Sequence, residues 1–119
     1  MKDIRLDVGL LDHHKTVRLE RTLGHESFKN LLRLWMYVSR NKPSGVLNGM
    51  TIAEIEMAAK WRGEPGKFVE ALLLIGWLDN NDGSLKIHDW EYHQPWVVGA
   101  EHRSRMAKIN ALKRWRPRK

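Results

Sequence analysis

The basic side chains gathered at the end of the chain are the residues whose chemistry is easiest to define. Residues 101–119 hold eight lysines and arginines and a single acid, Glu101. Such a segment can neutralise several phosphates of a nucleic acid, and Trp115 adds a ring on which a base can stack. The basic residues are Arg103, Arg105, Lys108, Lys113, Arg114, Arg116, Arg118 and Lys119.

Two other interpretations of this basic segment remain open. The spacing of Met106, Ile109 and Leu112 predicts a helix from about residue 100 to 115, which Pro117 ends. This helix could be a solvated charge run held to the body by those apolar residues. An anionic membrane surface is a weaker alternative, because the apolar face is thin.

The distribution of charge also points to the basic segment. The formal net charge is +7, yet residues 1–100 contain 13 basic and 13 acidic residues. A neutral body followed by a basic segment is a common arrangement in proteins that bind a polyanion.

Length and composition narrow the class of protein. A chain of 119 residues is enough for one domain with its own core. It contains no cysteine, which excludes disulfides and thiolate-bound zinc and favours a reducing, cytoplasmic setting. The longest apolar run, from Ala71 to Leu78, is far shorter than the roughly 20 residues of a membrane helix. We therefore expect no membrane partner.

The histidines raise the question of a metal site. His88, Asp89 and His93, together with the pair His13 and His14, supply imidazole and carboxylate groups. Because neighbouring side chains of a strand face opposite sides, we expect His88 and Asp89 not to converge, and we assign these histidines surface or capping roles. We expect no metal and no cofactor. No catalytic triad, phosphate-binding glycine loop or carboxylate pair is evident, so we do not expect an enzyme.

A helix–turn–helix is predicted between residues 51 and 76. Thr51 and Glu54 have the spacing of a capping box, and Ile52, Ile55 and Ala59 follow at helical intervals. We expect Gly63 to end this first helix in a left-handed conformation and Pro65 to begin the next one. In the second helix the inward residues should be Phe68, Leu72 and Ile75, with Gly76 just past its end.

A hairpin should follow the second helix. Two short runs, 77–81 and 84–88, flank Asp82 and Gly83, a pair favoured in hairpin turns. Val46 and Leu47 are placed to form a short strand beside it. The order helix, turn, helix and hairpin predicts a winged helix, so the expected fold class is mainly α with a small β-hairpin (α+β).

The remaining elements surround this motif. Strict alternation over 3–8 suggests a strand with Ile4, Leu6 and Val8 inward. Helices are expected over 15–23 and 27–40, the second with Leu31, Leu34, Trp35 and Val38 buried. We divide the chain into an N-terminal extension (1–23), a winged-helix core (24–92) and a basic C-terminal helix or tail (93–119).

Within the body, four cations are candidates for contact with DNA: Lys60, Arg62, Lys67 and Lys86. The outward face of the second helix should carry Lys67, Glu70, Ala71 and Leu74. Without Arg, Asn or Gln it lacks the usual partners of base edges, so the motif could equally be a scaffold or a protein-binding surface. Lys29, Arg33, Tyr37 and Arg40 form a second stripe at helical spacing, which we interpret as a solvated face rather than a phosphate-binding one.

The chain contains six tryptophans, an unusually high number for its length. Trp35, Trp61, Trp77 and Trp90 lie where core packing explains them. Trp96 and Trp115 lack such an explanation.

Several motifs together resemble the N-terminal domains of phage replication proteins, in particular replisome organisers and DnaD-like primosomal proteins. The motifs span 11–16, 34–37, 45–47, 55–56, 75–79 and 87–93, followed by the basic helix that ends at Trp115. The resemblance covers nearly the whole chain. It implies a winged helix that binds origin DNA or self-associates and precedes a second domain that recruits the replicative helicase.

We therefore expect a non-enzymatic DNA-binding module of phage or prophage replication, acting in the cytoplasm of a bacterial host. The expected partners are duplex or single-stranded DNA, a second copy of the chain, and a replicative helicase or its loader reached through a further C-terminal region. A winged-helix transcriptional regulator is the first alternative. A protein-interaction or oligomerisation module whose tail only solubilises it is the second.

Overall fold

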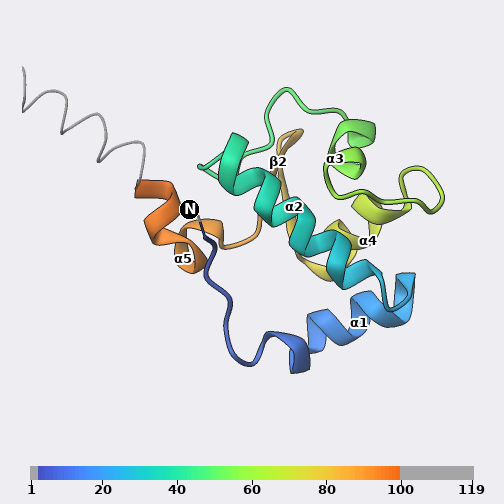
Figure 1. Cartoon of the computed structure of the whole chain (residues 1–119). Coiled ribbons are helices and arrows are strands. Elements are labelled where there is room, and N and C mark those ends of the chain that lie inside the picture. Colours follow the sequence, from blue (N-terminus) through green and yellow to red (C-terminus); the bar gives the residue numbers. More distant parts are fainter. Residues whose placement is uncertain (1–2, 100–119) are drawn as a thin grey trace, which may run out of the picture.

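The computed structural model describes residues 3–99, which form a mainly helical body with one small antiparallel sheet (Figure 1). The predicted class, mainly α with a small β-hairpin, is thereby confirmed. The elements are η1 (Leu10–Asp12), α1 (His14–Leu23), α2 (Ser27–Asn41), α3 (Ile52–Ala58), α4 (Lys67–Ile75), β1 (Leu78–Asn81), β2 (Ser84–Ile87) and α5 (Trp90–His93).

Helix α2 runs through the middle of the body, with α1 along one side and α3 along another (Figure 1). Its buried side carries Leu31, Leu34 and Val38, which are fully enclosed, and Trp35. The predicted inward face of this helix is confirmed, because an apolar stripe at helical spacing can leave water only by facing other elements. Helix α1 also ends at Gly24, as expected.

The predicted N-terminal strand is wrong. Residues 3–7 pair with no strand, and Leu6 and Val8 are exposed. The described sheet contains only β1 and β2, and neither of them pairs with this segment. The side-chain amide of Gln94 takes the place of a strand by bonding both the N–H and the carbonyl of Arg5.

Helix α3 begins with the predicted capping box. The Thr51 hydroxyl accepts the Glu54 N–H, and the Glu54 carboxylate accepts the Thr51 N–H, each at 3.1 Å. Hydrogen bonding to the carboxyl group, first from the Thr51 backbone N–H and then from the Thr51 side chain, lowers the pKa of Glu54. Ile55 is fully buried, whereas Ile52 is half exposed although it shares the periodic pattern.

The turn between α3 and α4 differs from the predicted one. Lys60, not Gly63, adopts the left-handed conformation after α3, with φ 58°. Pro65 lies in a turn before Gly66, and α4 begins only at Lys67. The start of α4 is set instead by a carboxylate from the preceding helix.

That carboxylate belongs to Glu56, which is buried on α3. It accepts the backbone N–H groups of Gly66, Phe68 and Val69 at 2.8, 3.1 and 3.2 Å. These donors would otherwise be unsatisfied at the first turn of α4, and the helix dipole favours a negative charge there. Glu56 therefore joins the two helices and fixes where the second begins.

Helix α4 buries Phe68, Leu72 and Ile75 and ends at Gly76, as predicted. The expectation that Ala71 points outward is wrong, because this residue is buried. The apolar stripe of α4 is therefore wider than its larger side chains suggest, since small residues can also face the core.

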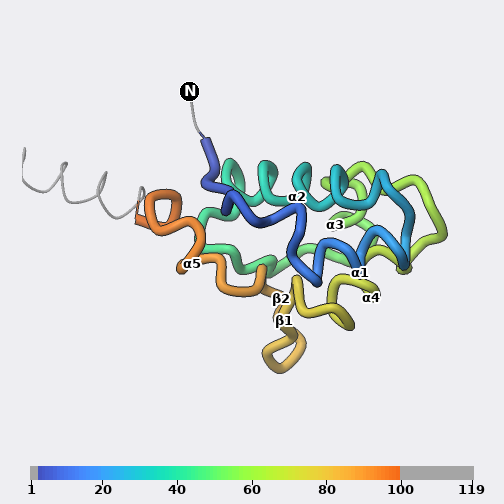
Figure 2. The backbone as a smooth tube through the Cα atoms, turned by 90° about the horizontal axis from the view of Figure 1, so that it is seen from below, coloured from blue at the N-terminus to red at the C-terminus, as the bar shows by residue number. Residues whose placement is uncertain are grey.

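The hairpin is confirmed where it was predicted, and Figure 2 shows it projecting from the helical body. Asp82 and Gly83 have φ values of 53° and 88°, the positive values of a tight hairpin turn. Val46 forms an isolated bridge with Lys86, and the Leu47 N–H donates to the Leu85 carbonyl at 2.8 Å. The predicted short strand segment beside the hairpin is therefore present as this bridge.

The contact between Glu56 and α4 can be tested by substitution. Glu56→Gln keeps the shape but removes the charge and turns an N–H donor toward the backbone N–H groups, so the free energy of unfolding should fall by about 3 kcal/mol. The matched change Glu64→Gln, at an exposed residue, should cost less than about 0.5 kcal/mol. Urea denaturation measures both. Equal losses would show that Glu56 does not hold the two helices together.

Candidate nucleic-acid interface

The residues predicted to contact DNA divide into two groups. Nine of them, Arg103, Arg105, Lys108, Lys113, Arg114, Trp115, Arg116, Arg118 and Lys119, lie outside the residues that the structure describes. The other four, Lys60, Arg62, Lys67 and Lys86, have definite positions.

Lys60 and Arg62 lie on the turn between α3 and α4 and are exposed. Between them Trp61 packs against the ring of Phe68, with ring centres 5.4 Å apart, and donates its indole N–H to the Glu64 carbonyl at 3.0 Å. These two contacts of Trp61 hold the turn against the core, while Lys60 and Arg62 remain on the surface. Neither forms an ion pair with any residue in 3–99, so both are free to contact a phosphate.

The exposed face of α4 offers little positive charge. Lys67 lies 3.8 Å from the Glu70 carboxylate on the same face, and Leu74 is exposed beyond them. The predicted outward positions of these three residues are confirmed. An exposed pair at this spacing contributes little to stability, but it cancels the positive charge next to any bound phosphate.

The amino end of α4 is also closed to phosphate. Glu56 takes three of its N–H groups, and the Lys67 N–H donates to the Glu64 carbonyl at 3.2 Å. An anion binds at a helix start through free N–H groups. Since these four are already bonded, a phosphate has no backbone donor there.

Lys86 lies apart from the other body cations. Its ammonium group is 2.8 Å from the Glu91 carboxylate of α5. Figures 1 and 2 both place α5 and the turn between α3 and α4 toward opposite ends of the body. The structure therefore does not bring Lys86 together with Lys60 and Arg62.

The stripe on α2 is more open to an anion than its sequence pattern suggested. Helix α2 contains no acidic residue, and Lys29 and Arg40 are exposed while Arg33 is half-buried. None of the three forms an ion pair with a residue in the described range 3–99. We keep the interpretation that this stripe is a solvated face, which the α2 variants below test.

The histidine at the end of the hairpin is arranged differently from the prediction. His88 Nδ1 lies 2.9 Å from the Asp79 carboxylate, and its Nε2 lies 3.3 Å from the Asp89 carboxylate. The expectation that His88 and Asp89 face opposite sides is wrong, because Asp89 leaves the strand with φ 52°. Among residues 3–99, no three His, Asp or Glu side chains gather closely enough to hold a metal ion.

The overall charge of the described body is close to neutral. Residues 3–99 contain 12 lysines and arginines and 13 aspartates and glutamates. No helix within this range has both the length and the apolar character needed to cross a bilayer. Comparison of the chain with protein-family models, curated proteins and solved structures gives no match.

Proposed function

We propose that this chain is a non-enzymatic DNA-binding module that holds its ligand mainly through backbone phosphates. The observation that carries the proposal is the distribution of charge: the segment 101–119 has a net charge of +7, whereas the body is nearly neutral. Phosphate contacts supply most non-specific affinity for DNA, and they require such a local excess of cations.

The arrangement of the body supports a winged helix. Helices α3 and α4 are joined by a short turn, α4 leads directly into the hairpin β1–β2, and Val46 bridges to that hairpin. In helix–turn–helix proteins the second helix commonly enters the major groove. Here α4 offers one paired lysine and a closed amino end, which favours contacts that are independent of base sequence.

Replication of a phage or prophage is the proposed setting, and the sequence resemblance to replisome organisers supports it. A helicase or its loader is the protein partner that this setting implies.

Transcriptional regulation by the same fold is the first alternative. The exposed Leu74 on α4 and Met57 on α3 favour the second, a module that binds a protein or another copy of the chain.

Removing equal numbers of cations from two surfaces tests the role of the basic segment. The triple variant Arg103→Gln, Arg105→Gln and Lys108→Gln should flatten the slope of log K against log salt by about 2 to 3 units, since each lost phosphate contact removes about 0.9. The matched triple Lys29→Gln, Arg33→Gln and Arg40→Gln, on α2, should leave the slope unchanged. Titration of random duplex at several salt concentrations measures both. Equal changes would contradict a dominant role for the tail.

Two substitutions on α4 separate DNA contact from contact with a second copy. If α4 lies against DNA, Glu70→Lys and Leu74→Arg should raise non-specific affinity and steepen the salt slope by about one unit each. If α4 packs against another copy, the new charge should break the assembly and light scattering should show a smaller particle. DNA-binding activity without either effect would exclude α4 from both interfaces.

A further inference from the structure

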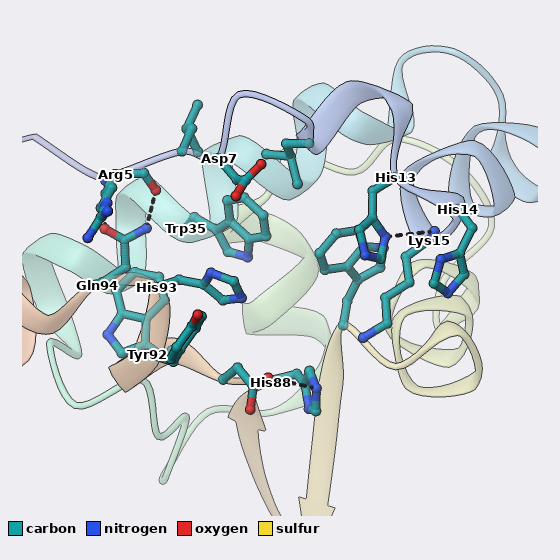
Figure 3. A pocket seen from close by; sticks show the side chains of 15 residues that line it. Arg5, Asp7, His13, His14, Lys15, Trp35, His88, Tyr92, His93 and Gln94 are labelled. Atoms are coloured by element: carbon teal, nitrogen blue, oxygen red, sulfur yellow. Dashed lines mark hydrogen bonds and ion pairs between the residues drawn. The ribbon is translucent and has the colours of Figure 1, made fainter.

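A cavity of about 430 Å³ lies between the N-terminal arm, the start of α1, helix α2 and helix α5. Figure 3 shows side chains from all four segments around one space, with Trp35 on one side and His13, His88 and His93 around it. Its size falls within the range of small-molecule sites. None of the four predicted DNA-contacting residues that the structure describes lines it, so the cavity is separate from those cations.

Residues 5–7 form one wall of the cavity, and a buried glutamine holds this arm at Arg5. Gln94 accepts the Arg5 N–H at 2.6 Å and donates its amide N–H to the Arg5 carbonyl. Only 3% of Gln94 is exposed. Because the contact uses main-chain atoms, the arm is fixed while the side chains of Arg5 and Leu6 remain at the cavity.

The walls of the cavity are largely aromatic. Trp35 and Trp77 meet edge to face with ring centres 5.6 Å apart, and the ring of His13 lies 6.3 Å from that of Trp77. Trp90, His88 and His93 add further rings. Flat π-surfaces of this kind favour a planar ligand that can stack.

The aromatic walls also contain hydrogen-bond donors without acceptors. The indole nitrogens of Trp35 and Trp77 are buried and have no hydrogen-bond partner in the described part of the chain. The indoles of Trp61 and Trp90, by contrast, donate to the carbonyls of Glu64 and Pro43. A buried donor left unpaired costs free energy, and both indoles belong to rings that line the cavity, so a ligand that brings an acceptor into reach of either nitrogen would gain a hydrogen bond.

The nearby polar groups strengthen this bias. His13 Nδ1 accepts the Lys15 N–H at 3.2 Å, so its remaining proton is on Nε2 and makes that nitrogen a third donor. The Asp7 carboxylate already accepts the Gly9 N–H, and the Asp89 carboxylate is 3.3 Å from His88. The cavity therefore has a donor to offer at His13, and each of its two carboxylates is already engaged by a neighbouring group.

We propose that this cavity takes an unpaired nucleobase, from a single DNA strand or a free nucleotide. A base is planar and carries several ring nitrogens and carbonyl oxygens that accept hydrogen bonds. A phenylalanine or tryptophan of a partner protein would stack equally well but would leave the donors unpaired. The proposal extends the proposed function from phosphate contact to recognition of an unstacked base, and it depends on that function for single-stranded DNA as the source.

The test uses the full chain and labelled oligonucleotides of one length, followed by fluorescence anisotropy. An oligodeoxyadenylate strand should bind about tenfold more tightly than an abasic strand with the same phosphates, the ratio expected for one stacked base. Duplex DNA should resemble the abasic strand. Competition by deoxyadenosine monophosphate at millimolar concentration would identify the free nucleotide as a ligand, and its absence would identify the strand.

A matched pair of histidine variants assigns this preference to the cavity. His13→Asn removes one ring, and its shorter amide cannot donate from the position of Nε2, yet it keeps an oxygen that can cap α1. It should lower affinity for the adenylate strand about fivefold and leave the abasic strand unchanged. His25→Asn, at a fully exposed side chain, should change neither. Trp35→Phe keeps a ring but removes a buried indole N–H, and it should act as His13→Asn does.

Either of two results would overturn the inference. Equal affinity for the adenylate and abasic strands would exclude a base site. A base preference that survives both His13→Asn and Trp35→Phe would belong to another ring, such as Trp115. If duplex DNA binds and either result is found, only this inference fails. Absence of binding to every nucleic acid would overturn the proposed function as well.

Discussion

The contact between the Glu56 carboxylate and the first turn of α4 is the constraint on which the motif depends. A buried carboxylate is tolerated only when hydrogen bonds replace the water it has lost, and three backbone N–H groups do so here. The same bonds determine where α4 begins and therefore which face of the helix, the one with Phe68 and Leu72, packs against the core. Because the hairpin follows directly after Gly76, its position also depends on this contact.

This constraint has a consequence for binding. An internal carboxylate occupies the helix end at which a phosphate would ordinarily find free donors. With Lys67 paired to Glu70 and Lys86 paired to Glu91, the motif keeps only the turn cations Lys60 and Arg62 in the open. We therefore propose that two parts of the chain bind different parts of the nucleic acid. Cations of the turn and the tail contact phosphates, and the aromatic cavity binds a base.

The sequence was a good guide where structure depends on neighbours along the chain. The Thr51 capping box, the buried stripe of α2 and the turn at Asp82 and Gly83 are all set by residues within a few positions.

Predictions failed where a residue far away in the sequence determines the local structure. Residues 3–8 alternate as a strand does, but the group that binds this segment is the side chain of Gln94, 89 positions from Arg5. The start of α4 was misplaced at Pro65 because Glu56, on the preceding helix, provides its cap. The cavity was not predicted, since it joins segments from both ends of the described chain.

The central claim is that nucleic acid does not bind the backbone N–H groups at the amino end of α4, and amide and indole NMR signals of the full chain test it directly. On titration with a single-stranded oligonucleotide, the indole signals of Trp35 and Trp77 should shift while the backbone signals of Phe68 and Val69 stay in place. The indoles of Trp61 and Trp90, whose N–H groups are already bonded, serve as internal references. Shifts at Phe68 and Val69 with Trp35 and Trp77 unmoved would contradict the account.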